Sequence, residues 1–283
     1  MIIQSPIEDI SGGWRYTEGV LLGHQVEDAE RDSCVAAEVP VGVIYGGFSY
    51  AVMMATPADL VDFAVGFSVT EGIINSPDDM TELAWRGDDV GVELNVSLSP
   101  ASMKRFLSRR RVRGLRGHTS CGVCGIEDLA SLSRTALMRV RPGRCPQEST
   151  ILSVFESLRN YQPLSCMTRG AHAAGWASID GTLRTVREDV GRHNALDKLL
   201  GACLRAGSDL SDGFVVITSR CSFEMAQKAA TAGVSVMASV SVPTALAIRT
   251  AREAGLTLIA PRFDRRPTVY ADPNSFMIEA GAR

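Results

Sequence analysis

The sequence predicts an α/β protein whose C-terminal half contains a sheet of parallel strands covered by helices. Two features support this prediction: strand-like and helix-like segments alternate after residue 212, and a glycine follows each helix-like segment. Such alternation is typical of βαβ units, which place parallel strands side by side beneath helices. A smaller unit of strands and a helix is predicted for the N-terminal part of the chain.

The first predicted elements are a hairpin and a separate strand. Apolar runs at residues 39–44 and 48–54 flank the pair Gly46-Gly47, which suits a tight hairpin turn. Residues 92–98 alternate between apolar and polar side chains, and this period of two indicates a half-buried strand.

A helix is predicted to begin at residues 56–59. Thr56 can cap it, and Pro57 suits its first turn. Four apolar side chains then recur on one helical face, namely those of Leu60, Phe63, Ala64 and Phe67.

The middle of the chain is basic and contains a pair of cysteines. Residues 104–116 look helical and carry seven lysines and arginines, either as a solvated face or as a docking surface for an acidic partner or a phosphate-bearing ligand. Phe106 is their only aromatic residue, which argues against stacked single-stranded nucleic acid. A helix is predicted at 126–138 and a linker at 141–146.

The last third of the chain shows the clearest alternation. Strands are predicted at 214–218, 234–240 and 256–260, and helices at 222–232 and 243–254, ended by Gly233 and Gly255. Because ligands gather at the carboxyl ends of parallel strands, we expect residues 219–222, 241–244 and 261–266 to lie along one rim. We divide the chain into an N-terminal subdomain at 1–117, a cysteine-bearing loop and linker at 118–146, and an α/β core at 147–283.

The composition argues against several classes of function but identifies none. The chain has 283 residues, 45% hydrophobic content and a net charge of −3, which gives no general argument for nucleic-acid binding. The first ten residues do not read as a signal peptide, and no apolar stretch reaches the length of a membrane span. Seven cysteines, an odd number without a framework, suit a reducing cytoplasm.

Cys121 and Cys124 are the strongest candidates for chemistry. Two thiols separated by two residues can share a metal, form a disulfide or pass a sulfur atom between them. A zinc site needs more ligands, and without a second such pair it would have to recruit His118 or His172. Two unreactive cysteines in a turn are the plainest alternative. Flanking glycines and the predicted helix that follows favour an exposed, nucleophilic or sulfur-carrying thiolate.

A second polar concentration lies at residues 187–198, directly before an apolar stretch. One interpretation is a capped helix with salt bridges. The other is a ligand site in which Arg192 and His193 donate hydrogen bonds and Asp189 orients one of them. Residues 168–174 look like another binding turn, where His172 is either structural or functional.

Taken together, these segments resemble the formate dehydrogenase accessory sulfurtransferase family, the FdhD-like proteins. The resemblance covers most of the chain and rests above all on CGVCG at 121–125 and EDVGRHNA at 188–195, which are highly specific in combination. Further matching segments are 38–40, 54–60, 66–67, 71–74, 172–174, 222–225 and 228–229.

The resemblance implies a sulfur carrier with sulfurtransferase activity. Such a protein takes persulfide sulfur from a cysteine desulfurase and passes it to the molybdenum bis-molybdopterin guanine dinucleotide cofactor of formate dehydrogenase. By the same resemblance Cys121 bears the persulfide, while Cys124 shares the sulfur or assists its release. The family core is similar to the cytidine deaminase fold, a three-layer arrangement around a mixed sheet, and its members are homodimers.

The resemblance also implies where the cofactor binds, and GDP is expected to mimic it. The family's cofactor-binding segment maps onto Pro261, Arg262, Phe263, Asp264, Arg265 and Arg266. Ala260-Pro261-Arg262-Phe263 replaces the usual Gly-Phe-x-Arg pattern there, although the cationic character remains. Because the cofactor is a polyanion, side chains at other strand ends are expected to help hold it, namely His172, Asp189, Arg192, His193 and Arg220.

Three rival functions remain open from the sequence. A thiol–disulfide oxidoreductase would use the same cysteine pair to form a reversible disulfide. A non-catalytic chaperone would hold the cofactor while another protein inserts the sulfur. A zinc-stabilised regulatory module would bind stoichiometric metal.

Overall fold

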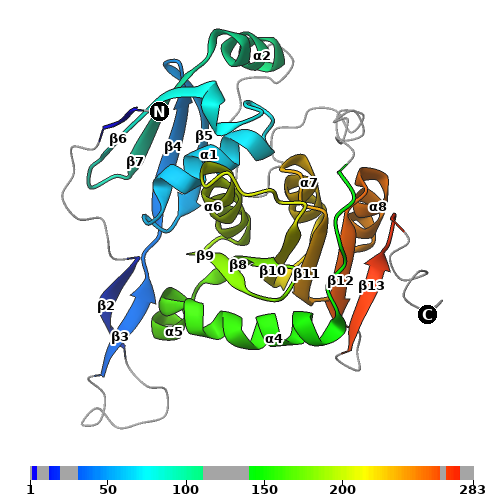
Figure 1. Cartoon of the computed structure of the whole chain (residues 1–283). Helices are drawn as coiled ribbons and strands as arrows, with labels where there is room; N and C mark the ends of the chain where they lie inside the picture. The colour runs from blue at the N-terminus through cyan, green and yellow to red at the C-terminus, as the bar shows by residue number, and fades with distance from the viewer. Residues whose placement is uncertain (1, 5–12, 20–30, 111–139, 262–265, 275–283) are drawn as a thin grey trace.

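The computed structural model describes residues 2–4, 13–19, 31–110, 140–261 and 266–274 of the chain. In these ranges two mixed sheets lie on either side of a pair of packed helices (Figure 1). None of the helices in these ranges combines the length and the apolar character that crossing a membrane requires.

The larger sheet has six strands in the order β13-β12-β11-β10-β8-β9. Neighbours β10, β11 and β12 are parallel, whereas β8 runs antiparallel to β10 and β9, and β13 runs antiparallel to β12. The predicted α/β class with parallel strands is therefore confirmed. The strand bounds are β8 His172–Ser178, β9 Leu183–Asp189, β10 Gly213–Arg220, β11 Val236–Ser241, β12 Thr257–Pro261 and β13 Pro267–Ala271.

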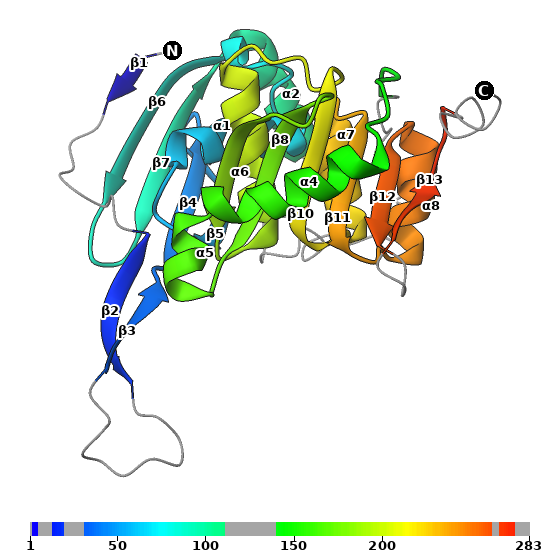
Figure 2. The same cartoon turned by 60° about the horizontal axis from the view of Figure 1, so that its bottom comes forward.

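Helices cover both faces of this sheet and make three layers (Figures 1 and 2). On one face lie α6 (Arg192–Arg205), α7 (Phe223–Thr231) and α8 (Ala245–Ala254), whose apolar sides share one core with the strands. On the other face lies α4 (Glu148–Leu158), with α5 (Pro163–Thr168) beside it. The alternation predicted from the sequence after residue 212 is confirmed. The more specific likeness to a cytidine deaminase core stays a prediction.

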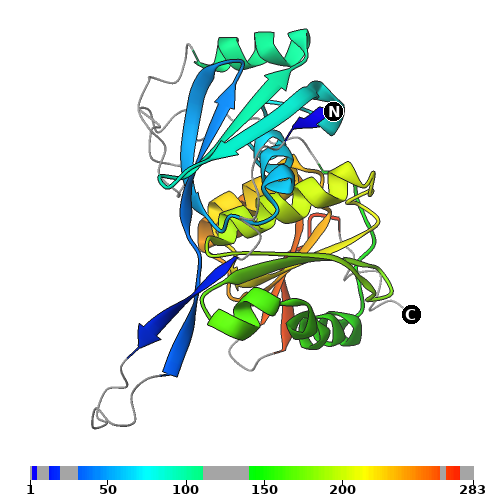
Figure 3. The ribbon, with the colours of Figure 1, turned by 90° about the vertical axis from the view of Figure 1, so that its left-hand side faces the viewer.

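The smaller sheet has five strands in the order β1-β6-β7-β4-β5. The predicted hairpin is confirmed, because β4 and β5 pair antiparallel around Gly46 and Gly47, whose φ angles of 54° and 82° require glycine-like freedom. The predicted strand at 92–98 is also confirmed as β7. The bounds are β1 Ile2–Gln4, β4 Val39–Tyr45, β5 Phe48–Ala55, β6 Met80–Gly87 and β7 Val92–Leu98. A separate antiparallel pair, β2 (Trp14–Gly19) and β3 (Arg31–Ala36), projects from the body (Figure 3).

Helix α1 (Leu60–Thr70) joins the two halves and begins later than predicted. Asp59, in a left-handed conformation, is its N-cap, and Thr56 does not cap it. The reason is that the backbone around Thr56 is bound by the start of α6, as described below, so the chain bends through residues 57–59 before the helix begins. Almost every residue of α1 is buried, because the helix is enclosed between the smaller sheet and α6.

The crossing of α1 and α6 is unusually close and depends on two glycines. A Cβ atom at Gly66 of α1 would overlap the carbonyl group of Asp197 and lie 2.9 Å from the amide nitrogen of Gly201. A Cβ at Gly201 would in turn lie 2.7 Å from the amide nitrogen of Gly66. The two backbones therefore touch directly, which fixes α6 relative to the smaller sheet.

Other predicted features lie partly outside the described residues. The basic helix is seen as α2 (Pro100–Arg110), whereas its continuation and the predicted helix at 126–138 fall in the range 111–139, which the structure does not describe. Residues 141–146 carry neither helix nor strand, as the linker prediction requires. The proposed domain boundaries stay a prediction.

Candidate functional site

The topology of the larger sheet gathers most of the predicted binding residues at one edge. The parallel strands β10, β11 and β12 end there, β9 also ends there, and the antiparallel strands β8 and β13 begin there. We call this the carboxyl edge; six strands separated by five spacings of about 4.8 Å make it roughly 24 Å wide. The described residues on it are His172, Asp189, Arg192, His193, Arg220, Pro261 and Arg266.

The remaining predicted site residues lie outside the described part of the chain. These are Cys121, Cys124, Arg262, Phe263, Asp264 and Arg265. Pro261 is described at the end of β12, where its carbonyl oxygen accepts a hydrogen bond from the Tyr270 hydroxyl at 3.5 Å. Arg266 is exposed beside it, at the start of β13.

Asp189 is a buried structural centre rather than an orienting partner for Arg192 or His193. Its carboxylate oxygens accept hydrogen bonds from the backbone nitrogens of Thr56 at 3.0 Å and Gly191 at 2.7 Å. The Asn194 side-chain amide donates a third at 3.1 Å, and the Lys198 ammonium pairs with the carboxylate at 2.6 Å. The role thus differs from the one predicted, because these groups saturate a carboxylate that has no exposed surface.

The same interactions bind the segment before α1 to the start of α6. The Lys198 ammonium also donates to the carbonyl oxygen of Thr56 at 2.9 Å, and Val190 N donates to the Thr56 hydroxyl at 3.2 Å. The Asn194 amide donates to the carbonyl oxygen of Met54 at 2.7 Å. As a result, the turn before Arg192 and His193 and the first turns of α6 are hydrogen-bonded to the segment that precedes α1.

His193 lies in the first turn of α6, close enough to Lys228 and Glu224 of α7 for their charges to act on it. Only 8% of its surface is exposed, and its Nε2 atom has no hydrogen-bond partner. Burial, reinforced by the charges of Lys228 and Arg192, lowers the pKa of His193 to about 4 against the opposing effect of Glu224. Its imidazole is therefore neutral at neutral pH.

His172 lies at the start of β8, opposite Asp189 in the strand register. Burial and the nearby Arg192 lower the pKa of His172, and Asp189 offsets part of this shift. The structure thus brings His172, Arg192 and His193 into one neighbourhood. Residues 172–174 belong to a strand, however, and Arg169 ends α5 in a left-handed conformation, so the predicted binding turn at 168–174 differs from what is observed.

A buried charge cluster beneath this site was not predicted from the sequence. The Lys228 ammonium, on α7, contacts Asp197 of α6 at 2.8 Å, Thr70 at 2.9 Å and Glu71 at 3.5 Å. Burial lowers the pKa of Lys228, but the two carboxylates outweigh this effect and the net shift is upward. The sequence signal that could have revealed Lys228 is a charged residue among the apolar residues of a helix. The same signal is present at Lys198.

Stability should depend on the protonation of His193. Its pKa is about 4 in the folded protein against 6.5 for the free side chain, so the unfolded chain binds a proton more readily between these values. We expect the free energy of unfolding to fall by roughly 3 kcal/mol from this group as pH decreases through that window. Urea denaturation of wild type and His193→Gln at several pH values checks this, and parallel curves for the two proteins would contradict it.

The buried cysteines at the sheet behave as packing residues. Burial raises the pKa of Cys203 to about 11 and that of Cys221 to about 12, so both thiols stay protonated at neutral pH. Cys221 lies at the end of β10, near the carboxyl edge, but it has no exposed surface. Neither thiol is suited to act as a nucleophile.

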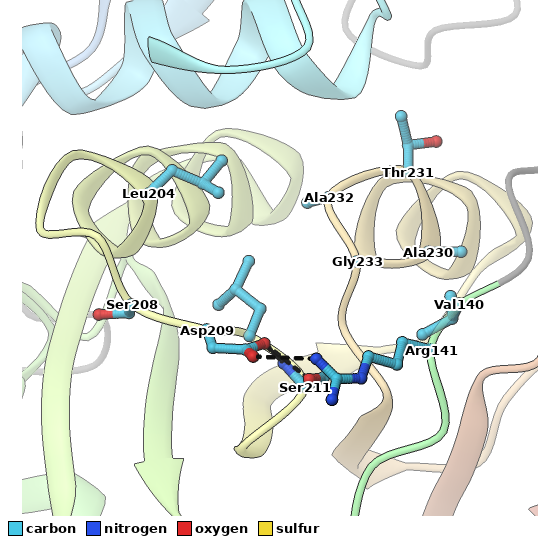
Figure 4. Close-up of a pocket in the computed structure, with 11 residues that line it drawn as sticks. Val140, Arg141, Leu204, Ser208, Asp209, Ser211, Ala230, Thr231, Ala232 and Gly233 are labelled. Atoms are coloured by element: carbon cyan, nitrogen blue, oxygen red, sulfur yellow. Dashed lines mark hydrogen bonds and ion pairs between the residues drawn. The ribbon is translucent and has the colours of Figure 1, made fainter. Parts of the chain in front are cut away.

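A cavity of about 340 Å³ lies at the opposite edge of the sheet (Figure 4). Its walls come from the ends of α6 and α7 and from the loop before β10, with Leu204, Leu210 and Ala230 among its apolar residues. Arg141, paired with Asp209 at 3.8 Å, lies at its mouth. None of the predicted site residues lines this cavity.

Comparisons with known proteins identify relatives that match most of the chain. The model of the FdhD/NarQ family matches residues 36–277. A sulfur carrier protein FdhD from Xanthomonas axonopodis pv. citri is 46% identical over 245 residues, covering 84% of each chain. Another from Cupriavidus necator is 44% identical over 246 residues, covering 87% of this chain and 84% of the relative.

A solved structure shares the fold. It is a crystal structure described as a candidate formate dehydrogenase accessory protein from Desulfotalea psychrophila, with a TM-score of 0.69 and 24% sequence identity. The match covers 92% of this chain and 97% of that one. At this identity the likeness concerns the fold alone.

Proposed function

The chain belongs to the FdhD/NarQ family, and from this premise we propose that it is a sulfur carrier in the maturation of formate dehydrogenase. The observation that carries the proposal is identity near 45% to proteins named sulfur carriers, in a chain that contains the cysteine pair. We place the protein in the cytoplasm as a homodimer, and we regard it as a sulfurtransferase.

The proposed chemistry begins at Cys121. Its thiolate attacks the outer sulfur of a persulfide on a cysteine desulfurase, so that the donor S–S bond breaks as a new S–S bond forms on Cys121. The donor leaves as a thiolate, and no net oxidation occurs. In this proposal Cys124 either attacks the outer sulfur, which moves the persulfide to Cys124 and frees the Cys121 thiolate, or attacks the Cys121 sulfur, which forms a Cys121–Cys124 disulfide and releases the outer sulfur as hydrosulfide.

The proposed acceptor is the molybdenum bis-molybdopterin guanine dinucleotide cofactor of formate dehydrogenase, bound here as a substrate. Its phosphates need hydrogen-bond donors and cations. The cations of the carboxyl edge, Arg192, Arg220 and Arg266, support this assignment, as does an edge wide enough for a large ligand. GDP is the simplest probe of such binding.

The test is intact-protein mass spectrometry after incubation with a cysteine desulfurase and cysteine. Wild type is expected to gain about one sulfur mass, reversed by dithiothreitol, and Cys121→Ala is expected to lose this gain completely. Cys124→Ala shows whether the second thiol is needed for Cys121 to accept the sulfur. Cys166→Ala, which removes an exposed cysteine, is the matched control.

Three results would contradict the carrier mechanism. If wild type gains no sulfur while the desulfurase is shown to be competent, the cysteine pair is not a sulfur acceptor. A two-proton mass loss that appears on oxidation and returns on reduction, without sulfur gain, would instead favour the thiol–disulfide oxidoreductase. If Cys121→Ala still supports maturation of formate dehydrogenase, the non-catalytic chaperone is favoured.

A further inference from the structure

We propose that the cavity opposite the carboxyl edge binds a free aliphatic α-amino acid, whose carboxylate contacts Arg141 and whose ammonium contacts Asp209. This site is separate from the proposed transfer of sulfur and does not depend on it. None of the described residues assigned to that function lines the cavity.

The first observation is the size of the cavity and its apolar lining. A volume of about 340 Å³ is at the small end for ligand sites in proteins, which favours a small molecule over a nucleotide. Leu204 at the end of α6 and Ala230 and Ala232 at the end of α7 contribute apolar walls (Figure 4). Leu210, from the loop before β10, adds to them. Such walls favour an aliphatic group over water.

The second observation is a loose pair of opposite charges at the mouth of the cavity. The side chains of Arg141 and Asp209 are 80% and 60% exposed, so both are accessible to a ligand. Nη1 of Arg141 lies 3.8 Å from Oδ2 of Asp209, which is too far for a hydrogen bond (Figure 4). Because exposed ion pairs contribute little to stability, a ligand can separate these two groups at low cost.

Asp209 is held in place by Ser211. Its Oδ1 atom accepts hydrogen bonds from the Ser211 backbone nitrogen at 2.9 Å and from the Ser211 hydroxyl at 2.6 Å. These bonds, with a smaller contribution from Arg141, lower the pKa of Asp209 from its ordinary value. The carboxylate is therefore ionised at neutral pH. Its Oδ2 atom takes part in neither bond and is free to accept one from an ammonium group.

The ends of two helices favour a positive group at the same place. α6 ends at Arg205 and α7 at Thr231, and residues at both ends line the cavity. The carboxyl end of a helix carries a partial negative charge, which attracts cations. Arg205 does not neutralise it from within the cavity, because it pairs with Asp62 and does not line the walls.

Only a zwitterion with an apolar side chain satisfies all three features. A carboxylate without an amine would pair with Arg141 but leave its negative charge beside Asp209 and the helix ends. An amine without a carboxylate would face the positive charge of Arg141. An α-amino acid carries both charges on neighbouring atoms and projects its side chain away from them, so that the side chain can enter the apolar part of the cavity.

The test is calorimetric titration of the whole chain, purified under reducing conditions, with four small molecules. L-Leucine is expected to bind with about millimolar affinity, as suits a small ligand at an open site. Isocaproate lacks its ammonium, isoamylamine lacks its carboxylate, and glycine lacks its side chain. Each of these three is expected to bind about tenfold more weakly or not at all, because each loses one of the proposed contacts.

Two charge variants assign the contacts. Asp209→Asn is expected to weaken leucine binding about tenfold and to remove the preference for leucine over isocaproate. Arg141→Gln is expected to remove the preference for leucine over isoamylamine. Arg86→Gln is the matched control, because Arg86 is an equally exposed cation paired with Glu93 on the smaller sheet. All three changes are at exposed side chains, and circular dichroism verifies that the variants are folded.

NMR of labelled leucine methyl groups in the protein locates the ligand. The signals of Leu204 and Leu210, assigned by Leu204→Met and Leu210→Met, are expected to shift on addition of leucine. The signal of Leu152, which is exposed on α4, is expected to stay unchanged.

Specific results would overturn this site. The absence of saturable leucine binding well above millimolar concentration would exclude it. Equal affinity for leucine and isocaproate, or undiminished leucine binding by both charge variants, would exclude the zwitterion contacts on which it rests. Leucine binding that leaves the Leu204 and Leu210 signals unshifted would place the ligand elsewhere. Sulfur loading of Cys121 is expected to be the same in all these variants, so failure of this site and failure of the carrier mechanism are distinguishable.

Discussion

Replacing Lys228 with methionine is expected to lower the free energy of unfolding by about 3–5 kcal/mol, the usual cost of removing one partner from a buried ion pair. Asp197, which has no exposed surface, would lose its 2.8 Å contact and remain as a buried charge. The 3.5 Å contact between the Lys228 ammonium and Glu71 would be lost as well. Methionine fills similar volume, so the loss reports charge rather than packing.

The pH dependence of this variant separates charge from packing. In Lys228→Met, burial without a cation raises the pKa of Asp197 further, so acidification protonates this carboxyl in the folded state first. The deficit relative to wild type should therefore shrink as pH falls towards about 4, the ordinary range of carboxyl groups. In wild type, Lys228 has a raised pKa, so its contribution is present at neutral pH and is lost as pH rises through that value.

Urea denaturation monitored by circular dichroism measures both effects. Lys104→Met is the matched control, because this exposed lysine on α2 should change stability by no more than about 0.5 kcal/mol. Adding Asp197→Asn to Lys228→Met should recover part of the loss. A deficit that stays constant with pH, or equal losses in the Lys104 and Lys228 variants, would show that the cluster is not a charge-compensated core.

The order of strands and helices in the C-terminal half could be read from the sequence because local signals are strong there. Alternating apolar segments and the glycines at 233 and 255 mark each element, and both glycines have the positive φ angles that end helices. The carboxyl edge followed from this order alone, since parallel strands end together. No information on distant contacts was needed.

The interior of the site could not be predicted, because it depends on contacts between distant segments. Asp189 reads as part of a polar motif, yet its partners include Thr56, which is 133 residues away. The sequence likewise suggests Thr56 as a helix cap, but in the structure its backbone and hydroxyl are bound by Asp189, Val190 and Lys198 instead. Lys198 and Lys228 carry no local signal except that they interrupt apolar helices, and their partners become visible only when α1, α6 and α7 are packed.

Gly66→Ala is expected to destabilise the protein by about 3 kcal/mol or more, at the upper end of the range for overpacked cores. An alanine Cβ would overlap the carbonyl group of Asp197 and lie 2.6 Å from its carbon atom. Because the obstacle is backbone, no rotamer change relieves it, and α1 must move away from α6. That movement would disturb Thr56 and the turn before His193, so GDP binding should weaken together with stability.

The sign of the change in unfolding free energy tests whether the two helices touch. In an open helix interior, glycine to alanine stabilises by about 1 kcal/mol, which is opposite to the effect expected here. Gly201→Ala should resemble Gly66→Ala, and the double variant should lose less than the sum because both changes separate the same two helices. Gly42→Ala in β4 is the control, since its nearest neighbour would lie 3.8 Å from the new Cβ. A stabilised Gly66→Ala protein in urea denaturation would mean that the two helices do not touch in solution.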